Sequence, residues 1–401
     1  MKGNISKFYM FSFFRMFALF TPVIVLFWQD AGLSMTMIMI LQSYFGILLA
    51  ILEIPTGTLA DRYGERKSVM AGSFLVIIAC LVYYQSTCFW HFVIAETIWA
   101  LSAALISGAD SALLYNTLEC IGEKESFKKI QGNSLALSII GGGIASLMGG
   151  LVGETSLRLT FLLTAIFFVL SYLAVSLMDE PRSRSAEKRA SYFSILSETY
   201  KFVNKHRLVK WYIAYTACIS AFINLFLWFY QPYMQHTGLT IAWFGIAFTI
   251  YNLGAALSSK FSQEINSFFG KSMLFVMPVF LILPLFVMPW LLCAGSFLLI
   301  LFHQFNRGVH RNILNDRILA YTFENKRATV LSLCSLLAVG IRSILGPVLG
   351  YLFDVWGFDS FYVFGILFSA VFLFFYLAFR RIPEKYFTVK LYPPAAAGSF
   401  E

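Results

Sequence analysis

Charged residues are scarce in this chain of 401 residues. Asp, Glu, Lys and Arg make up 13% of it, whereas soluble domains carry about 25%. Hydrophobic residues make up 59%, and the mean hydropathy is +0.73. So few charges cannot coat a water-soluble globule of 45.4 kDa. The composition therefore excludes a soluble fold and predicts an integral membrane protein, because a bilayer leaves most of the protein surface without a polar coat.

Motifs of several other protein classes are also absent. The six cysteines form no Cys-x-x-Cys pair, so neither a disulfide framework nor a zinc site is expected. The phosphate-binding pattern Gly-x-x-x-x-Gly-Lys-Ser/Thr does not occur, nor do the His-Glu-x-x-His and Gly-x-Ser-x-Gly patterns of hydrolases. We therefore expect no enzyme, no bound metal and no cofactor.

Long apolar runs, in contrast, recur along the whole chain. At about 20 residues for each membrane-spanning helix, they predict twelve helices and therefore an all-α membrane protein. An even number of spans places both chain ends on the same side of the membrane. The runs cover residues 8–28, 35–57, 68–84, 90–112, 134–153, 157–177, 209–234, 241–262, 272–288, 290–310, 328–352 and 358–379.

Basic residues are distributed unequally between the two sides that this topology defines. Of the 30 Lys and Arg residues, all but Arg15, Arg158, Arg307 and Arg342 lie on the side that carries both chain ends. Cytoplasmic loops carry such an excess, so both termini are predicted to be cytoplasmic, and we expect a bacterial inner membrane protein. The net charge of +9 thus reflects topology and does not indicate nucleic-acid binding.

The chain divides into two similar halves. A polar linker, 179–208, separates a six-helix bundle at 1–178 from a second one at 209–382, and its later part is predicted to form an amphipathic surface helix. Residues 383–401 form a cytoplasmic tail whose last residues resemble a cloning remnant. At an offset of 197 residues, the glycine-rich segment 143–153 aligns with 340–350. Two parallel six-span repeats are typical of transporters with a site between the halves.

A loop signature lies between the second and third spans. It reads Gly-Thr-Leu-Ala-Asp-Arg-Tyr-Gly-Glu-Arg-Lys, and the residues that carry it are Gly57, Asp61, Arg62, Gly64, Arg66 and Lys67. The signature resembles Gly-x-x-x-Asp-Arg-x-Gly-x-Arg-Arg/Lys of the major facilitator superfamily, at the position that this family requires. The resemblance implies two pseudo-symmetric six-helix bundles. It also implies that the loop latches their cytoplasmic side, with Asp61 facing the start of span 11.

Two glycine-rich segments are candidate helix-packing hinges. Span 5 contains Gly149 and Gly153, and span 11 contains Gly346, Pro347 and Gly350. The first is similar to the Gly-Pro-x-x-Gly signature of proton-coupled drug exporters, although it lacks the proline, and plain helix packing explains it equally well. A second departure is that span 4 has Glu96 where these exporters carry a basic residue.

Ionisable and polar residues inside the spans are the candidates for a substrate or proton site, because a buried charge costs several kcal/mol without a partner or a wet cavity. Their number is small. These residues are Arg15, Glu53, Glu96, Asp110, Asn224, Tyr230, Gln231, His303, Arg307 and Arg342. The resemblance implies that spans 1, 4, 7 and 10 line a central cavity. Three candidates have an alternative role outside a substrate or proton site. Asp110 is also explained as an ordinary residue at a helix end, and Glu53 as a residue that supports the neighbouring signature loop. Tyr230 is also explained as part of the aromatic belt at the membrane interface.

The function that these features favour is secondary active transport by alternating access. Proton-coupled efflux of a small amphipathic organic compound is the leading hypothesis, with an ion gradient as the energy source, an antiport mechanism and a monomeric protein surrounded by lipid. The alternatives are transport of a metabolite or siderophore as an organic anion, and a receptor or lipid scramblase on the same fold. Arg15 and Arg307 either bind an anionic substrate or pair with an internal carboxylate, for which Asp110 is the nearest candidate.

Overall fold

The computed structural model describes residues 1, 3–181, 203–204 and 206–383. Most of the predicted linker with its surface helix, and all but the first residue of the predicted tail at 383–401, lie outside the described residues. Every regular element in the described ranges is a helix. Nine helical segments there are long and apolar enough to cross a membrane by length and composition. The predicted all-α membrane fold is therefore confirmed.

The chain forms two units by its contacts, consisting of the described parts of Met1–Glu187 with Gln231–Asn252 (unit 1) and of Lys188–Tyr230 with Leu253–Glu401 (unit 2). The segment Gln231–Asn252 thus packs with unit 1, although it follows the predicted linker.

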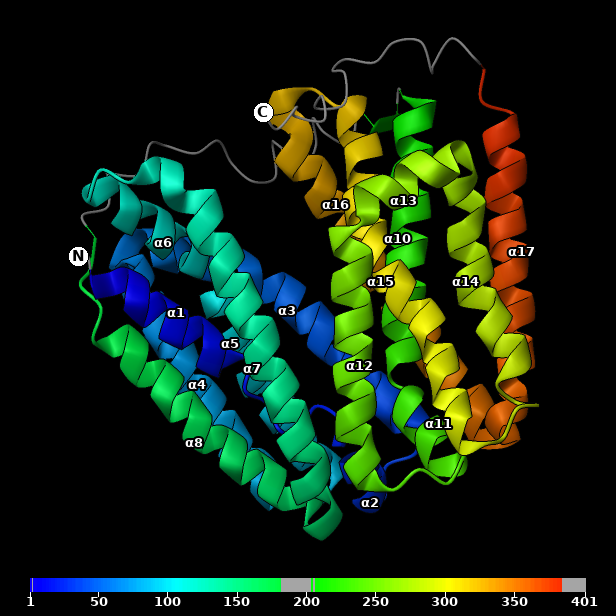
Figure 1. The fold of residues 1–401 in the computed structure, drawn as a ribbon, viewed down its shortest axis with the longest axis horizontal. Coiled ribbons are helices and arrows are strands. Elements are labelled where there is room, and N and C mark those ends of the chain that lie inside the picture. The colour runs from blue at the N-terminus through cyan, green and yellow to red at the C-terminus, as the bar shows by residue number, and fades with distance from the viewer. Residues whose placement is uncertain (2, 182–202, 205, 384–401) are drawn as a thin grey trace. The chain divides into compact units, whose positions relative to one another are not determined.

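The helices of unit 1 are α1 (Gly3–Arg15), α2 (Ile24–Asp30), α3 (Met35–Tyr63), α4 (Glu65–Gln85), α5 (Phe89–Ile106), α6 (Ala109–Cys120), α7 (Phe127–Thr155) and α8 (Leu157–Ser176). Most of α11 (Tyr230–His236) and the first part of α12 (Ile241–Lys260) join them. In unit 1, α4 packs between α5 and α8, and α1 packs on α7 and α8 (Figure 1). Stacked rings of Phe20, Tyr83 and Phe161 fill the core.

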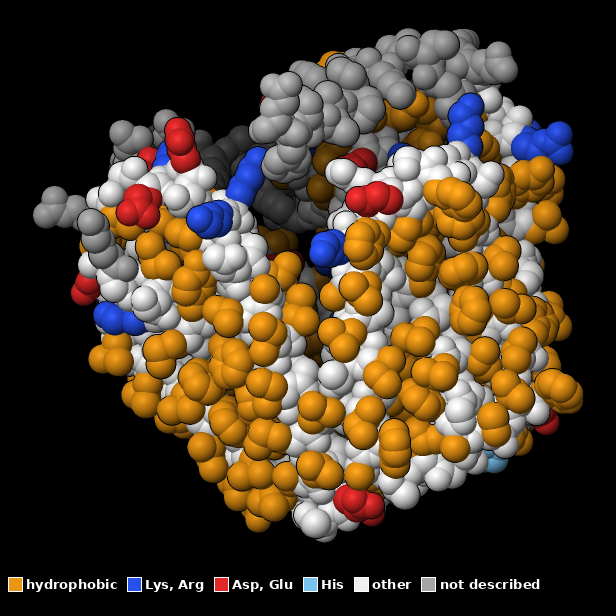
Figure 2. Space-filling model, viewed as in Figure 1, with side chains coloured by type: hydrophobic (Ala, Val, Ile, Leu, Met, Phe, Trp, Pro, Cys, Tyr) orange, Lys and Arg blue, Asp and Glu red, His pale blue; other side chains and the backbone are white. Residues whose placement is uncertain are grey.

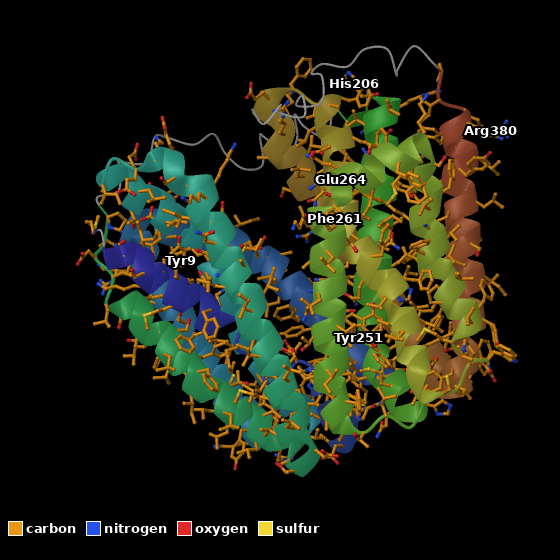
Figure 3. All side chains as sticks on the ribbon, viewed as in Figure 1. Tyr9, His206, Tyr251, Phe261, Glu264 and Arg380 are labelled. Atoms are coloured by element: carbon orange, nitrogen blue, oxygen red, sulfur yellow. The ribbon has the colours of Figure 1, made fainter. Side chains whose placement is uncertain are left out.

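The helices of unit 2 are α10 (Arg207–Leu227), α13 (Ser262–Phe269), α14 (Met273–Val287), α15 (Ile300–Ala320), α16 (Arg327–Trp356) and α17 (Ser360–Arg380). Here α10 packs against α15 and α16, and α14 packs against α15 and α17. Phe222 of α10 stacks on Phe368 of α17 with 3.7 Å between ring centroids. His206, just before α10, and Arg380, at the end of α17, lie at the same end of this unit (Figure 3).

Some predicted spans are interrupted. The range 8–28 forms α1 and α2, which are separated by turns after Arg15, and the range 90–112 forms α5 and α6. The second break lies at Gly108, whose φ of +77° belongs to the left-handed region that favours glycine. Both breaks place a charged residue, Arg15 or Asp110, at a helix end, where it can reach a neighbouring element.

Large apolar side chains cover the outer faces of the helices. Figure 2 shows hydrophobic side chains over most of the visible face of each unit. Exposed examples are Leu151 on α7 and Phe374 on α17. Such extended apolar surface is unfavourable in water and is the surface expected of helices that contact lipid.

Candidate functional site

The loop signature forms the junction between α3 and α4. Gly64 ends α3 and precedes α4 with a φ of +104°, so a larger residue there would be strained. Arg66 donates through Nε to the Val175 carbonyl at 3.3 Å and through Nη2 to the Ser176 carbonyl. Its guanidinium thus satisfies carbonyls at the C-terminus of α8, where a cation is favoured.

Acidic residues complete this junction. Glu180 accepts a hydrogen bond from the Arg66 amide at 3.2 Å, and Glu65 accepts one from the Asn116 side chain at 2.9 Å. Burial, together with the nearby Glu65, raises the pKa of the Glu180 carboxyl. Of the other signature residues, Asp61, Arg62 and Lys67 are exposed, and a Cβ on Gly57 would meet no described residue within 4 Å.

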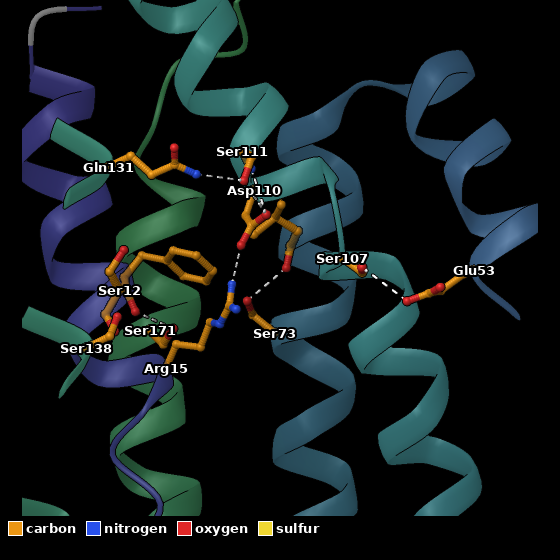
Figure 4. A network of polar contacts seen from close by, with 12 residues as sticks. Ser12, Arg15, Glu53, Ser73, Ser107, Asp110, Ser111, Gln131, Ser138 and Ser171 are labelled. Carbon is orange, nitrogen blue, oxygen red and sulfur yellow. Dashed lines mark hydrogen bonds and ion pairs between the residues drawn. The ribbon is translucent and has the colours of Figure 1, made fainter. Parts of the chain in front are cut away.

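Arg15 is neutralised inside unit 1. Its Nη1 lies 2.5 Å from Asp110 Oδ2 (Figure 4). The second carboxylate oxygen of Asp110 accepts a hydrogen bond from the Ser111 amide at 2.7 Å. The guanidinium also lies 5.5 Å from the centroid of the Phe11 ring. Asp110 is therefore the internal partner of Arg15, and the pair connects the end of α1 to the start of α6.

Glu53 and Glu96 have different surroundings. Glu53 is exposed and lies 3.4 Å from the Ser107 hydroxyl (Figure 4). Glu96 is only 5% exposed, and its Oε1 accepts hydrogen bonds from Tyr83 at 2.6 Å and Gln42 at 3.0 Å. Three helices, α3, α4 and α5, thus converge on one carboxyl group. These two hydrogen bonds fix the orientation of the carboxyl group.

Gln231 contacts the connection between α1 and α2. Its Oε1 accepts a hydrogen bond from the Val25 amide at 2.8 Å, and its Nε2 donates to the Thr21 carbonyl at 3.0 Å. Both groups of the side-chain amide are therefore used within unit 1, where they stabilise an interruption of the first span.

Polar and aromatic groups of unit 2 form a cluster around α15, in which Tyr230, His303 and Gln304 are buried and Arg307 is exposed. Gln304 donates to the Tyr230 hydroxyl at 3.4 Å and accepts a hydrogen bond from Arg307 at 3.0 Å. His303 stacks on the Tyr230 ring and lies 2.9 Å from the Leu281 carbonyl. The cluster brings together three predicted candidates, Tyr230, His303 and Arg307.

A cavity of about 340 Å³ lies between α10, α15 and α16 in unit 2. Two predicted candidates, Asn224 and Arg342, contribute to its wall. The full lining consists of Thr216, Ser220, Ala221, Asn224, Arg311, Asn315, Leu331, Cys334, Ser335, Ala338, Val339 and Arg342. Two of its polar atoms, Arg342 Nε and Thr216 Oγ1, are buried without a hydrogen-bond partner among the described residues. The volume of this cavity lies at the lower end of the range for small-molecule sites, and its lining is more polar than is usual for them.

Sequence reasoning missed five polar residues of this cavity: Thr216, Ser220, Arg311, Asn315 and Ser335. A signal exists for the first four, because Thr216, Ser220 and Asn224 recur every four residues and therefore share one face of α10. Arg311 and Asn315 have the same spacing on α15. Among the described residues, no group of three or more His, Cys, Asp or Glu side chains is arranged to hold a metal ion.

The predicted hinge glycines lie at close helix contacts or within buried helix faces. A Cβ on Gly149 would collide with the Leu19 carbonyl oxygen, and one on Gly153 would lie 3.0 Å from the Val23 side chain. Gly346 and Gly350 are buried in α16, which contains Pro347 within the helix. The glycines of α7 thus allow the α1–α2 connection to approach its backbone.

Comparisons with known proteins agree on one family. The sequence model of the Major Facilitator Superfamily matches residues 8–333. The uncharacterized MFS-type transporter YxaM of Bacillus subtilis (strain 168) is 26% identical over 275 residues, which cover 65% of this chain and 67% of that protein.

Solved structures share the fold. The nucleoside transporter NupG superposes with a TM-score of 0.80 at 14% identity, over 94% of this chain and 100% of that one. A bacterial homolog of the human lysosomal transporter Spinster superposes with a TM-score of 0.71 at 15% identity, over 98% of both chains. With the family model spanning most of the sequence, the chain belongs to the major facilitator superfamily.

Proposed function

We propose that this secondary transporter exports a small amphipathic organic compound by alternating access, with protons moving in the opposite direction. The observation that carries the proposal is the cavity between α10, α15 and α16, where polar and apolar side chains share one wall. Its lining offers hydrogen bonds to one end of a solute and apolar contacts to the other.

Proton coupling requires a group that changes its charge during the cycle. Glu96 supports this part of the proposal, because its carboxyl group is buried and is oriented by Tyr83 and Gln42. The resemblance of Gly149–Gly153 to the signature of proton-coupled exporters supports export as the direction. We place the protein in the bacterial inner membrane, as a monomer with both termini in the cytoplasm and with no resident cofactor or nucleic-acid partner.

Flux measurements in proteoliposomes test this function. The purified protein is reconstituted, and uptake of a panel of fluorescent acidic, neutral and basic amphipathic dyes is followed with an acidic lumen and without a pH gradient. Gradient-dependent uptake of at least one dye, beyond that into protein-free vesicles and abolished by a protonophore, is the expected result.

Parallel vesicles carry a fluorescent lipid to detect scrambling. Lipid movement without dye movement would favour the scramblase alternative, and binding of a dye without any flux would favour a receptor. If dye uptake were driven by a pH gradient only when the lumen is alkaline, the proposed exchange of solute for protons would be wrong, because solute and protons would then move in the same direction.

A further inference from the structure

We propose that the cavity between α10, α15 and α16 binds the anionic group of an organic anion, and that Arg311 and Arg342 hold this group. The inference rests on the proposed function, since it names the chemical class of the transported compound. It adds a charge requirement that the mixed lining alone does not specify.

The two arginines lie on different helices but contribute to the same wall. Arg311 is near the middle of α15 and is exposed, and Arg342 is near the middle of α16 and is partly buried. Thr216, Ser220 and Asn224 face the same cavity from α10, one turn apart. Guanidinium, hydroxyl and amide groups thus converge on one volume from three helices.

Among the described residues, the lining of this cavity offers no compensating negative charge, because it includes no Asp or Glu. The ion pairs formed by the part of the chain that the structure describes connect other residues and include neither Arg311 nor Arg342. Two cations that share a cavity within a membrane protein repel each other unless an anion lies near both. A bound anion would relieve this repulsion.

Hydrogen-bonding capacity also remains unused there. Arg342 Nε and Thr216 Oγ1 are buried without a partner among the described residues, and an unsatisfied buried polar group costs about 1–3 kcal/mol. Guanidinium groups present several N–H donors in a planar fork that matches carboxylate, sulfonate and phosphate oxygens. A ligand with such a group would satisfy both the charge and the donors.

The arginines elsewhere in the spans differ from this pair. Arg15 pairs with Asp110, and Arg307 donates a hydrogen bond to Gln304. The apolar part of the cavity lining, which includes Ala221, Leu331 and Val339, can accommodate a compact hydrocarbon or aromatic body. The geometry therefore fits an amphipathic anion whose charged end contacts the arginines.

Binding to the purified full-length protein in detergent tests the inference. The probes are 2-naphthoate, hexanoate and phenyl phosphate, together with the uncharged 2-naphthamide and the cationic 2-naphthylmethylamine, and thermal stability reports binding. At least one anionic probe is expected to raise the melting temperature, whereas the amide and the amine leave it unchanged. The inference would be overturned if the amide or the amine stabilised the protein as strongly as 2-naphthoate does. It would also be overturned if none of the anionic probes raised the melting temperature.

Variants connect this selectivity to the two arginines. Arg311→Gln and Arg342→Gln should each weaken binding of the anionic probe by about tenfold or more, the effect of losing a charge-assisted contact. Arg380→Gln removes an exposed charge at the end of α17 and serves as the matched control, with unchanged affinity expected. Equal affinity in the wild type and both cavity variants would also overturn the inference.

A charge insertion covers the case in which an arginine variant does not fold. Asn224→Asp keeps the side-chain shape and supplies a carboxylate to the same cavity, so it should abolish binding of the anion. Unchanged anion binding by Asn224→Asp would count against the site.

Counterflow of the same probes in proteoliposomes separates the two proposals. Arginine-dependent anion binding without flux would contradict the transport function but leave the anion site intact. Flux of neutral or cationic compounds that is insensitive to both arginine variants would support transport and overturn the anion site.

Discussion

Glu180 lies beyond the end of α8 and has an ionisation that should influence stability. Burial and the nearby Glu65 raise its pKa, so the folded protein binds this proton more readily than the unfolded chain does. Stability should therefore fall as the pH rises from the unfolded pKa of about 4.3 through the higher folded value. The amide of Glu180→Gln stays uncharged and can still accept the hydrogen bond from the Arg66 amide.

We expect Glu180→Gln to be more stable than the wild type at pH 7–8 and to lose this advantage as the pH falls toward about 4.3. Melting temperatures in detergent across this range measure the difference. Glu264→Gln on α13 controls for the loss of one negative charge. An advantage of Glu180→Gln that does not depend on pH would mean that ionisation of Glu180 is not its cause.

The pair of Arg15 and Asp110 gives a second prediction about single residues. Asp110→Asn leaves the half-buried guanidinium without its counter-charge, which should cost about 1–3 kcal/mol, less than for a fully buried pair. Adding Arg15→Gln removes the unpaired cation and should restore part of this stability. A double-mutant cycle by thermal unfolding measures the coupling, and simple additivity would show that the pair is energetically unimportant.

Among the helices, the contact between α7 and α12 depends on glycine. A Cβ on Gly150 would lie 2.7 Å from the Ala242 carbonyl oxygen, and a Cβ on Gly245 would collide with the Ser146 carbonyl oxygen. Both obstacles are backbone atoms, which cannot move aside as a flexible side chain can. Small residues permit this kind of close approach between membrane helices.

Gly245→Ala should therefore destabilise the protein by about 1–3 kcal/mol, as overpacking generally does. Gly132→Ala on α7 is the matched control, because its added Cβ lies within 4 Å of no residue that the structure describes. That change should be neutral or stabilising, since alanine favours the helix by about 1 kcal/mol relative to glycine. Thermal unfolding of both variants checks the prediction, and equal destabilisation would exclude the close contact as the cause.

The sequence predicts helices well where one long apolar run corresponds to one helix, as in α3, α7 and α8. It is less informative about α15. The polar residues Arg311 and Asn315 line a cavity, so they shorten the apolar run that marks this helix. Counting basic residues by side of the membrane grouped Arg311 with the cytoplasmic loops, so its four-residue spacing with Asn315 was not used to place it in a cavity.

Pairings between distant segments were even less accessible to sequence analysis. The predicted depth of Asp110 in the membrane suggested a contact with Arg15. The ion pair itself depends on helix interruptions after Arg15 and at Gly108, which no apolar periodicity reveals. Glu96 was identified as a buried acid, whereas its partners Tyr83 and Gln42 come from two other helices. Residue type and position thus indicated the candidates, and tertiary packing decided their partners.

For the molecule as a whole, the proposed cycle assigns different tasks to the two units. Glu96 of unit 1 would carry the proton, and the arginine cavity of unit 2 would bind the solute. Proton binding and solute binding should then be separable by mutation. Exchange and accumulation both require that the solute binds, whereas only accumulation against a gradient requires the proton.

Glu96→Gln should consequently abolish accumulation driven by a pH gradient while exchange of labelled for unlabelled solute continues. The glutamine keeps the shape of the side chain and a carbonyl oxygen that can accept hydrogen bonds from Tyr83 and Gln42, but it cannot release a proton. Arg342→Gln should reduce both accumulation and exchange, because it weakens solute binding itself. A pH-sensitive dye in the vesicle lumen records proton movement beside solute flux. If Glu96→Gln retains full proton-driven accumulation, coupling must depend on another acid of unit 1, with Asp110 and Glu53 as the next residues to replace.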